Sequence, residues 1–384
     1  MMKKICFVTT VSLTIKVFVI PTLKELIKCG EYDITVICNP DDSMVSLLPK
    51  GVHYIPVKME RGVSLSAFSA IRELKKIFKR EKFDYIQYST PNASLYASIA
   101  AKRVKCPIRL YAQWGIRYVG LSGIKRKIFK ILEHGTCKRS THIRSVSPMN
   151  MQFGISEGLY SQERVSVIGN GGTVGVNLDL FDISKKDDMR RDMRNKLSIS
   201  KEAYVFGFVG RMGRDKGSKE LLSSFRKMRQ DGSDAFLCLV GSNEMNNEIP
   251  TELVNWAQND SNVIITGNLP NEELPSYYAG FDCYVHPTYR EGFGMVLQEA
   301  GAMGNAIITT RVPGASEVMV ENESCVLVDK MNVDALYDAM LCLSNDRQIT
   351  ESLGEAAYKR TARLYESGIM VKNICEDIES VLGA

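Results

Sequence analysis

Short apolar runs alternate with longer amphipathic segments along both halves of the chain. Runs of four to six apolar residues bounded by turn residues are typical of buried strands, whereas apolar residues repeated every three or four positions indicate helices. The runs predict strands at residues 5–9, 34–38, 85–88, 108–112, 143–146, 204–209, 236–240, 263–267, 281–285, 306–309 and 325–328. The amphipathic segments predict helices at residues 22–28, 67–80, 92–103 and 125–138, with a further helix after residue 217.

This alternation predicts parallel sheets with helices on both faces, because each parallel connection has to cross back over the sheet. At 384 residues the chain is too long for one ordinary domain and suits two, each with its own core. The polar, glycine-rich residues 170–186 are the expected linker. Ligands bind outside the carboxyl ends of parallel strands, so two such edges are expected to face each other across a cleft.

One strand, turn and helix segment, residues 286–303, carries two carboxylates. Glu291 stands in the turn and Glu299 about one turn into the helix, while Gly292 and Gly294 let the backbone approach a ligand. The N–H groups of a helix end attract an anion, and a carboxylate can accept both hydroxyls of a ribose. Together these features describe a nucleotide-sugar site. Alternatively, each glutamate only complements the dipole of the helix.

A second loop, GRMGRDKG at residues 210–217, joins a predicted strand to a predicted helix. It has neither the Walker spacing nor the dinucleotide fingerprint. Arg211 and Lys216 instead place two cations at opposite ends of one short loop, where they can clamp a diphosphate without a metal. Taken alone, the same pattern also fits an ordinary basic turn.

Together the two patterns resemble the retaining glycosyltransferases of family 4, which have the B-type fold of two Rossmann-like domains. The G-R-x(4)-K-G loop of that family is matched by Gly210, Arg211, Lys216 and Gly217, and its E-x(7)-E signature by Glu291 and Glu299. The resemblance extends to His286 and Pro287, to Pro313, Gly314 and Glu317, and more loosely to residues 145–147, 169–172 and 177–181.

The resemblance implies an acceptor-binding domain at residues 1–175, completed by a crossing helix at residues 368–384, and a nucleotide-sugar-binding domain at residues 176–367. The implied catalytic residues are Arg211, Lys216 and Glu291. The implied donor-binding residues are Gly210, Arg211, Lys216, Gly267, Glu291, Gly292, Phe293, Gly294, Met295, Val296 and Glu299. The implied acceptor-binding residues are Thr10, Gln113, Trp114, Arg117 and Asn170.

The chain departs from the family pattern at two places in its first half. Residues 9–10 are threonines where many members have a glycine pair, and residues 113–115 read QWG where many carry a histidine before a glycine. Trp114 is expected either to form a stacking wall for a sugar ring, with Gln113 and Arg117 as polar contacts, or to lie buried in the core.

The net charge of +5 hides two halves of opposite sign. Residues 1–180 hold 27 Lys and Arg against 13 Asp and Glu, whereas residues 181–384 hold 22 against 31. Basic residues are densest at residues 124–144, an amphipathic helix that predicts contact with an anionic membrane surface. The residues expected to make that contact are Lys125, Arg126, Lys127 and Lys130. The alternative is a solvated face with its apolar stripe in the core, and nucleic acid is not expected because no binding module accompanies the charge.

The ten cysteines are scattered, without metal-ligand spacing, which predicts a reducing cytoplasm and no structural zinc. No metal cofactor is expected. No apolar run approaches the roughly 18 residues of a membrane span. The apolar stretch near the start resembles a signal peptide, but Lys16 interrupts it and no cleavage site follows, so residues 5–9 are interpreted as a strand. The expected location is the cytoplasm, with peripheral attachment to the inner face of the plasma membrane.

The activity implied by the resemblance is transfer of a sugar from a nucleotide-diphosphate sugar, preferably a UDP-sugar, to a saccharide acceptor. The basic helix suggests an acceptor linked to a polyprenyl diphosphate, as in capsule or O-antigen assembly. A nucleotide-sugar 2-epimerase of the same fold and a catalytically silent nucleotide-sugar-binding subunit are the alternatives. A glycoside hydrolase would use two carboxylates but would not need the cations of residues 211 and 216.

Overall fold

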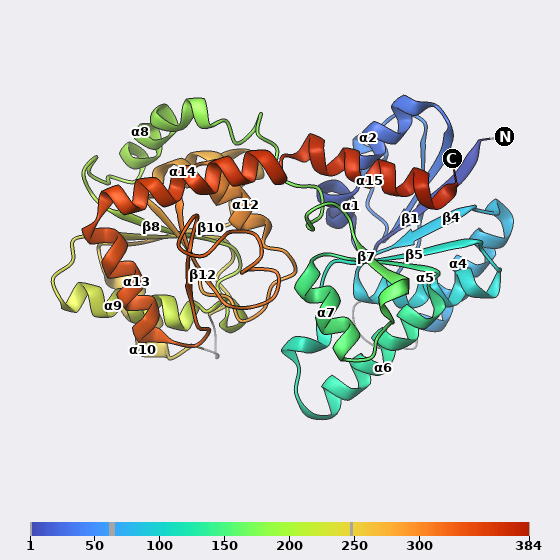
Figure 1. Cartoon of the computed structure of the whole chain (residues 1–384), viewed down its shortest axis with the longest axis horizontal. Coiled ribbons are helices and arrows are strands. Elements are labelled where there is room, and N and C mark those ends of the chain that lie inside the picture. The colour runs from blue at the N-terminus through green and yellow to red at the C-terminus, as the bar shows by residue number, and fades with distance from the viewer. Residues whose placement is uncertain (1, 61–65, 246–248, 384) are drawn as a thin grey trace. The chain divides into compact units, whose positions relative to one another are not determined.

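A computed structural model of the chain describes residues 2–60, 66–245 and 249–383. The chain divides into two compact units, Met1–Val174 with Gly368–Ala384, and Gly175–Ser367. Each unit is a parallel β-sheet with helices packed on it (Figure 1). The predicted α/β class with two Rossmann-like domains is confirmed.

The amino-terminal unit has its described strands in the order β3-β2-β1-β4-β5-β6-β7, with every neighbouring pair parallel. The strands are β1 (Lys3–Val8), β2 (Tyr32–Cys38), β3 (Val52–Pro56), β4 (Tyr85–Tyr88), β5 (Ile108–Gln113), β6 (His142–Ser145) and β7 (Val165–Val167). The helices are α1 (Ser12–Phe18), α2 (Ile20–Cys29), α3 (Met44–Leu47), α4 (Ser66–Glu81), α5 (Pro91–Arg103), α6 (Gly123–Arg139), α7 (Pro148–Ser156) and α15 (Ser367–Leu382). Two 3-10 turns are η1 (Arg117–Gly120) and η2 (Gln162–Arg164).

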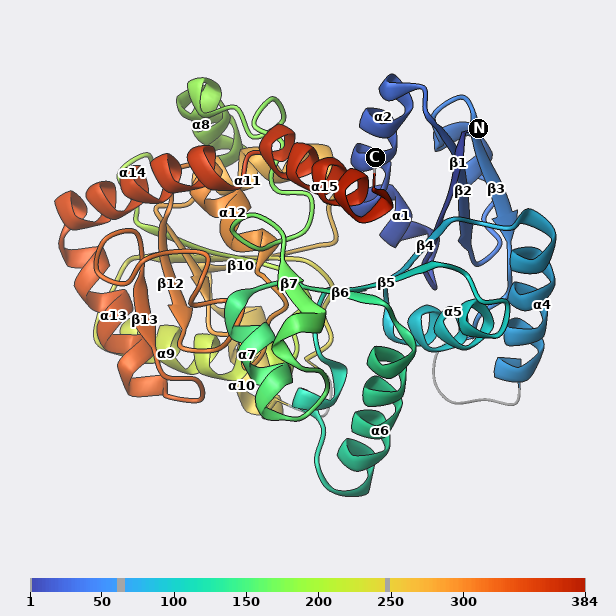
Figure 2. The same cartoon turned by 45° about the vertical axis from the view of Figure 1, so that its right-hand side comes forward.

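Each face of this sheet has its own apolar core. On one face the strands pack against α4, α5 and α6. On the other face they pack against α1, α2 and α15, where Val371 and Ile378 of α15 meet Leu23 of α2 and Phe7 of β1. Figures 1 and 2 both show α15 lying beside α1 and α2, although more than 300 residues separate them in sequence. The last helix is therefore part of the amino-terminal core.

The carboxyl-terminal unit has the strand order β10-β9-β8-β11-β12-β13, again parallel throughout. The strands are β8 (Val205–Val209), β9 (Phe236–Val240), β10 (Val263–Gly267), β11 (Cys283–His286), β12 (Ala306–Thr310) and β13 (Val326–Val328). The helices are α8 (Lys186–Lys196), α9 (Ser218–Gln230), α10 (Thr251–Asn259), α11 (Leu274–Gly280), α12 (Met295–Ala302), α13 (Val333–Asn345) and α14 (Arg347–Leu364). Three 3-10 turns are η3 (Ile183–Lys185), η4 (Arg214–Lys216) and η5 (Asn271–Glu273).

In both sheets the strand order reverses beside the first strand of the unit, between β1 and β4 and between β8 and β11. Connections on the two sides of such a switch point run in opposite directions, which leaves a crevice at the carboxyl ends of the strands. The loops after β8 and β11 flank this point in the carboxyl-terminal unit. They are the two loops that carry the cations and carboxylates singled out in the sequence.

Two edge strands escape prediction from the sequence. Val52–Pro56 is half exposed at one edge of its sheet and mixes His53 and Pro56 with apolar residues, so it lacks a continuous apolar run. Val165–Val167 has three residues at the opposite edge, too few to establish a pattern. The central strands are buried on both faces and are predicted correctly.

A buried arginine on α8 ties the start of the second sheet together. Arg194 is 3% exposed, and its guanidinium donates to Asp282 at 2.8 Å. It also donates to four backbone carbonyls, those of Ser200, Lys201, Ala203 and Gly280. Asp282 in turn accepts the backbone N–H of Val205, the first residue of β8. One side chain thus fixes the segment leading into β8 and the segment leading into β11.

Candidate active site

The loop between β8 and α9 approaches the loop after β11 at the level of the backbone. Gly217 has a φ of 71°, and a Cβ at this position would collide with the carbonyl oxygen of Pro287. Tyr289 donates its N–H to the carbonyl of Asp215 at 2.9 Å, which joins the two loops directly. Glycine is therefore required at residue 217 for both its backbone conformation and its lack of a side chain.

Lys216 and Glu291 meet at this junction. The Nζ of Lys216 lies 2.6 Å from Oε2 of Glu291, and Nε2 of His286 lies 3.0 Å from the same oxygen. The second carboxylate oxygen, Oε1, accepts the N–H of Gly292 at 3.0 Å. Three donors thus hold the Glu291 carboxylate in one orientation.

The surroundings of Glu291 and His286 determine the charge of each side chain. Burial would raise the pKa of Glu291, but the hydrogen bond from His286 and the charge of Lys216 outweigh burial and hold that pKa well below its usual range. Burial lowers the pKa of His286, against the opposing effect of Glu291. His286 is 1% exposed. At neutral pH Glu291 is therefore an anion and His286 a neutral donor through Nε2.

Glu299 lies on α12, which begins directly after Gly294. Gly294 has a φ of 56° at the N-cap, so the chain turns sharply and leaves the positive end of the helix at the loop. The hydroxyl of Tyr278 on α11 donates to Oε2 of Glu299 at 2.8 Å. Burial raises the pKa of Glu299, while the hydrogen bond from Tyr278 opposes that rise.

Arg211 is more exposed than Lys216, at 42% against 22% of the side chain. Its guanidinium pairs with Asp215 at 2.9 Å and with Glu244 at 2.8 Å. Glu244 is 51% exposed, and a pair in that setting contributes little stability. Arg211 can therefore exchange Glu244 for a more highly charged anion at small cost.

The other predicted donor-binding residues surround this cluster in different ways. Gly210 directly follows β8, and Met295 and Val296 open α12. Phe293 is buried and packs edge-on against Tyr365. Gly267 ends β10 and accepts the N–H of Gly241 at 2.9 Å, two strands away from β8.

The predicted acceptor-binding residues each have their own surroundings in the amino-terminal unit. Thr10 is buried after β1 and bonds to Thr90 and to the start of α5. Trp114 is partly buried beside Phe18, with ring centroids 5.3 Å apart. Arg117 lies over the Phe129 ring, and Asn170 is exposed in a turn.

Gln113 differs most from its predicted place. It is 1% exposed, its Nε2 donates to Glu133 of α6 at 2.6 Å, and its Oε1 accepts from Tyr160 at 2.8 Å. Both ends of its amide are thus engaged inside the unit. Gln113 therefore belongs to the interior network, and we leave it out of the proposed acceptor site.

Sequence reasoning missed three residues that organise the site. The sequence points to His286 only through the family resemblance, yet it donates to Glu291 five positions later. Asp215 pairs with Arg211 and with Arg290 and so links the two loops. Tyr278 orients Glu299 from a different helix. The spacing of His286 and Glu291 across one turn is a signal in the sequence, whereas Tyr278 reaches the site only through tertiary packing.

Two features are absent from the described residues. These residues contain no group of three or more His, Cys, Asp or Glu side chains arranged to hold a metal ion. None of their helices combines the length and the apolar character needed to span a bilayer.

Comparison with known proteins gives matches over both units. Residues 189–360 match the family model "Glycosyl transferases group 1", and residues 4–147 match the model "Glycosyl transferase 4-like". The capsular polysaccharide biosynthesis glycosyltransferase CapM of Staphylococcus aureus is 28% identical over 362 residues, 93% of this chain and 91% of that protein. An Escherichia coli UDP-Gal:alpha-D-GlcNAc-diphosphoundecaprenol alpha-1,3-galactosyltransferase is 21% identical over 333 residues, 84% of this chain and 83% of that protein.

Among solved structures, HepE of Anabaena in complex with UDP superposes with a TM-score of 0.79 at 18% identity, covering 98% of this chain and 100% of that chain. This likeness establishes the fold. The family matches and the curated relatives are glycosyltransferases, so they do not favour the 2-epimerase alternative. Residues 189–360 are therefore a group 1 glycosyltransferase domain, and residues 4–147 are a glycosyl transferase 4-like domain.

Proposed function

We propose that this glycosyltransferase takes its sugar from a nucleotide-diphosphate sugar, with UDP as the preferred carrier, and transfers it with retention to a saccharide on a polyprenyl diphosphate. The part of the proposal that concerns the sugar donor rests on one observation. Lys216, Glu291 and the start of α12 come together at the switch point of the second sheet. Cations and a helix start favour a diphosphate there, while the carboxylates favour sugar hydroxyls.

The proposed roles divide the site by charge. Arg211, Lys216 and the amino end of α12 hold the diphosphate, and Gly210, Gly292 and Gly294 let the backbone come close to it. Glu291 holds hydroxyls of the donor sugar, and Glu299, oriented by Tyr278, holds the ribose. The fixed carboxylate of Glu291 supports this division, because it is anionic and held by three donors.

In the proposed reaction, the bond from the anomeric carbon to the leaving phosphate oxygen breaks as the bond to the acceptor oxygen forms on the same face. The acceptor hydroxyl gives its proton to the leaving phosphate. Negative charge grows on that phosphate, so groups that bind it more strongly in the transition state lower the barrier. Lys216 and Arg211 supply this stabilisation.

A thermal-shift series with UDP, GDP and ADP tests the donor proposal. At a concentration one hundred times its Kd, a ligand stabilises the folded state by about 2.7 kcal/mol. UDP is expected to raise the melting temperature most, and Lys216→Ala is expected to reduce the rise. A series in which none of the three nucleotides shifts the melting temperature would refute the proposal. With the best donor, a new sugar nucleotide formed without acceptor would indicate a 2-epimerase instead.

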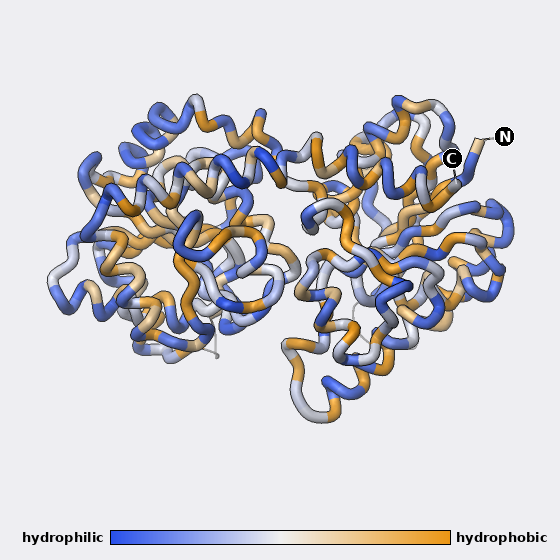
Figure 3. The backbone as a smooth tube through the Cα atoms, viewed as in Figure 1, coloured by the Kyte–Doolittle hydropathy of each residue, from blue (hydrophilic) through white to orange (hydrophobic). Residues whose placement is uncertain are grey.

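The acceptor half of the proposal draws on relatives and on the surface of α6. The Escherichia coli relative acts on a diphosphoundecaprenol-linked sugar, as its name states. In the present chain, Ile124, Ile128 and Ile131 recur at helical spacing on α6 with exposed fractions of 77%, 47% and 70%. Figure 3 shows apolar positions along this helix. The sequence pattern of these positions is equally compatible with burial in the core.

The four basic residues of α6 that are expected to contact the membrane fall into two pairs. Arg126 and Lys130 both contact Glu157, at 3.1 and 2.8 Å. Lys125 and Lys127 are exposed beside the isoleucines. An exposed aliphatic stripe flanked by lysines fits an anionic bilayer surface, where the stripe enters the headgroup boundary and the lysines meet lipid charge. We therefore place the membrane contact on the stripe and on Lys125 and Lys127.

Flotation with phosphatidylglycerol vesicles tests this surface. Replacing the three isoleucines by serine is expected to lower the partition coefficient about 10²-fold, because roughly 1 kcal/mol of apolar transfer is lost at each partly inserted side chain. Reversing Lys125 and Lys127 to Glu is expected to weaken binding mainly at low salt. Ile349→Ser, at a residue 44% exposed on α14, is the matched control and is expected to float like the parent. Flotation unchanged in the triple variant would exclude α6 as the contact.

A further inference from the structure

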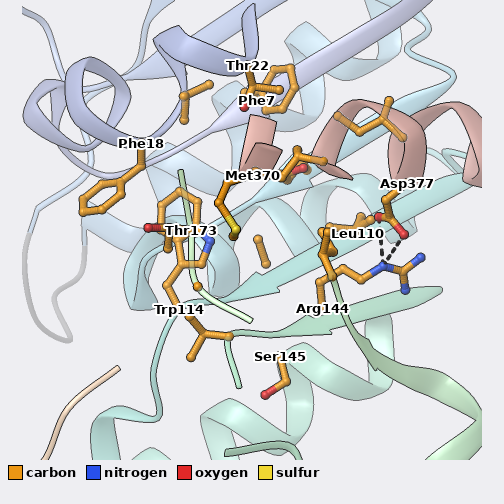
Figure 4. A pocket seen from close by; sticks show the side chains of 18 residues that line it. Phe7, Phe18, Thr22, Leu110, Trp114, Arg144, Ser145, Thr173, Met370 and Asp377 are labelled. Carbon is orange, nitrogen blue, oxygen red and sulfur yellow. Dashed lines mark hydrogen bonds and ion pairs between the residues drawn. The ribbon is translucent and has the colours of Figure 1, made fainter. Parts of the chain in front are cut away.

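A small pocket lies within the amino-terminal unit, between the sheet and the helices α2 and α15 (Figure 4). Its floor is formed by side chains from four neighbouring strands, Phe7, Gln87, Leu110, Ala112 and Arg144. Its roof is formed by Met370, Ile374, Asp377 and Ile378 of α15, with Thr22 of α2 beside them. It reaches the carboxyl edge of the sheet at Trp114, Gly172 and Thr173.

The two ends of the pocket differ in character. Trp114 and Phe18 form an aromatic wall at one end, as Figure 4 shows, with Met370 next to them. At the other end, Nε of Arg144 donates to both carboxylate oxygens of Asp377 at 2.9 Å. Because the two side chains neutralise each other, neither an anion nor a cation is strongly favoured at this end of the pocket.

The size of the pocket limits what fits. Its volume is about 40 Å³, and one water needs roughly 10–15 Å³ of the same measure. The pocket therefore has room for about three water molecules. A ligand group of roughly four non-hydrogen atoms occupies a similar space. A sugar ring or a prenyl chain is too large for it.

Gln87 supplies a polar group in these apolar surroundings. It lies on β4, between β1 and β5 in the middle of the sheet, yet its side chain keeps partial exposure at the pocket floor. Its Oε1 accepts from the hydroxyl of Tyr85 at 2.8 Å, which orients Nε2 as a donor. A ligand group here needs an apolar end and an acceptor oxygen, because a purely aliphatic group would leave the amide unpaired.

We propose that this pocket receives the acetamido group of an acceptor amino sugar whose ring lies against Trp114. The methyl group contacts Met370, Leu110 and Ile374, and the carbonyl oxygen accepts from Gln87. This inference rests on the proposed function, since it assigns the class of acceptor to the same enzyme. It makes the pocket the determinant of acceptor specificity.

Two acceptors that differ only at the second carbon test the subsite. N-acetylglucosaminyl diphosphate and glucosyl diphosphate, each on the same short polyprenyl chain, are compared at saturating donor. The parent is expected to prefer the acetamido acceptor by 10-fold or more in kcat/KM, the range that pocket discrimination of a small group reaches. Ala112→Val, which fills part of the pocket, is expected to bring this ratio close to one. Gln87→Leu is expected to reduce it as well.

Ala112→Ser is the matched control because it barely changes the side-chain volume, and its ratio is expected to stay near that of the parent. The UDP-induced rise in melting temperature shows that each variant is folded and has an intact donor site. A parent that uses both acceptors equally, or a preference that survives Ala112→Val, would overturn the subsite while leaving the proposed function standing. Donor binding without transfer to either acceptor would overturn the proposed acceptor class, and the subsite with it.

Discussion

Replacing Lys216 by alanine is expected to slow sugar transfer by about 10² to 10³-fold or more, the effect of removing a comparable electrostatic donor from an active site. The loss should fall mainly on kcat, because Lys216 binds a phosphate whose charge grows as the bond to the sugar breaks. The variant also leaves Glu291 without the ammonium at 2.6 Å, so its carboxylate is held by His286 and Gly292 alone. Steady-state kinetics with the best donor measure the effect.

Lys219→Ala is the matched control for this experiment. Lys219 is exposed on the first turn of α9, three residues after Lys216, and makes no part of the proposed diphosphate clamp. Its variant is expected to keep kcat within about two-fold, the effect usual for a solvent-exposed substitution of roughly 0.5 kcal/mol or less. A Lys216→Ala enzyme that turns over like the parent would show that the clamp has been assigned to the wrong residue.

Arg194→Met is expected to lower the stability of the carboxyl-terminal unit by about 3–5 kcal/mol, the cost of breaking a buried charge pair by removing one partner. The methionine fills much of the volume, but four backbone carbonyls lose their donor and Asp282 loses its contact at 2.8 Å. Arg190, at 2.6 Å from Asp282, limits the loss without replacing the bonds to the carbonyls. Urea unfolding, followed with and without UDP, measures the change.

Arg191→Met provides the comparison on the same helix. Arg191 is 61% exposed, and within the described part of the chain it pairs only with acids that are themselves exposed, Asp188 and Asp192. Its replacement is expected to change the unfolding free energy by roughly 0.5 kcal/mol or less. Equal stability of the Arg194 and Arg191 variants would contradict the structural role given to Arg194.

The donor half of the site is largely predictable from the sequence, because its residues follow buried strands that have clear apolar patterns. The runs before residues 210 and 286 place both loops at carboxyl ends of strands, and the glycines mark where the backbone turns. Neither apolar run indicates that β8 and β11 become neighbours in the sheet. The contact between Lys216 and Glu291, 75 residues apart, therefore emerges only with the fold.

The acceptor half is less predictable, because its side chains depend on partners from distant helices. Gln113 looks like a polar residue at a strand end, yet Glu133 of α6 and Tyr160 take both ends of its amide. The apolar residues of α6 satisfy a core pattern equally well, and only the packing leaves Ile124, Ile128 and Ile131 exposed. The pocket beside Trp114 needs α15, which follows some 250 residues later.

The assignment of α15 to the amino-terminal core has a consequence for how the chain is made. A ribosome completes all of Gly175–Ser367 before it adds the helix that covers one face of the first sheet. Until then Phe7, Leu110 and Ala112 lack the cover of α15 and have only α1 and α2 on their face of the sheet, while the later unit can already fold around its own apolar residues. The core of the first unit is thus completed only after the second unit has been synthesised, and this apolar face is where the nascent chain most needs a chaperone.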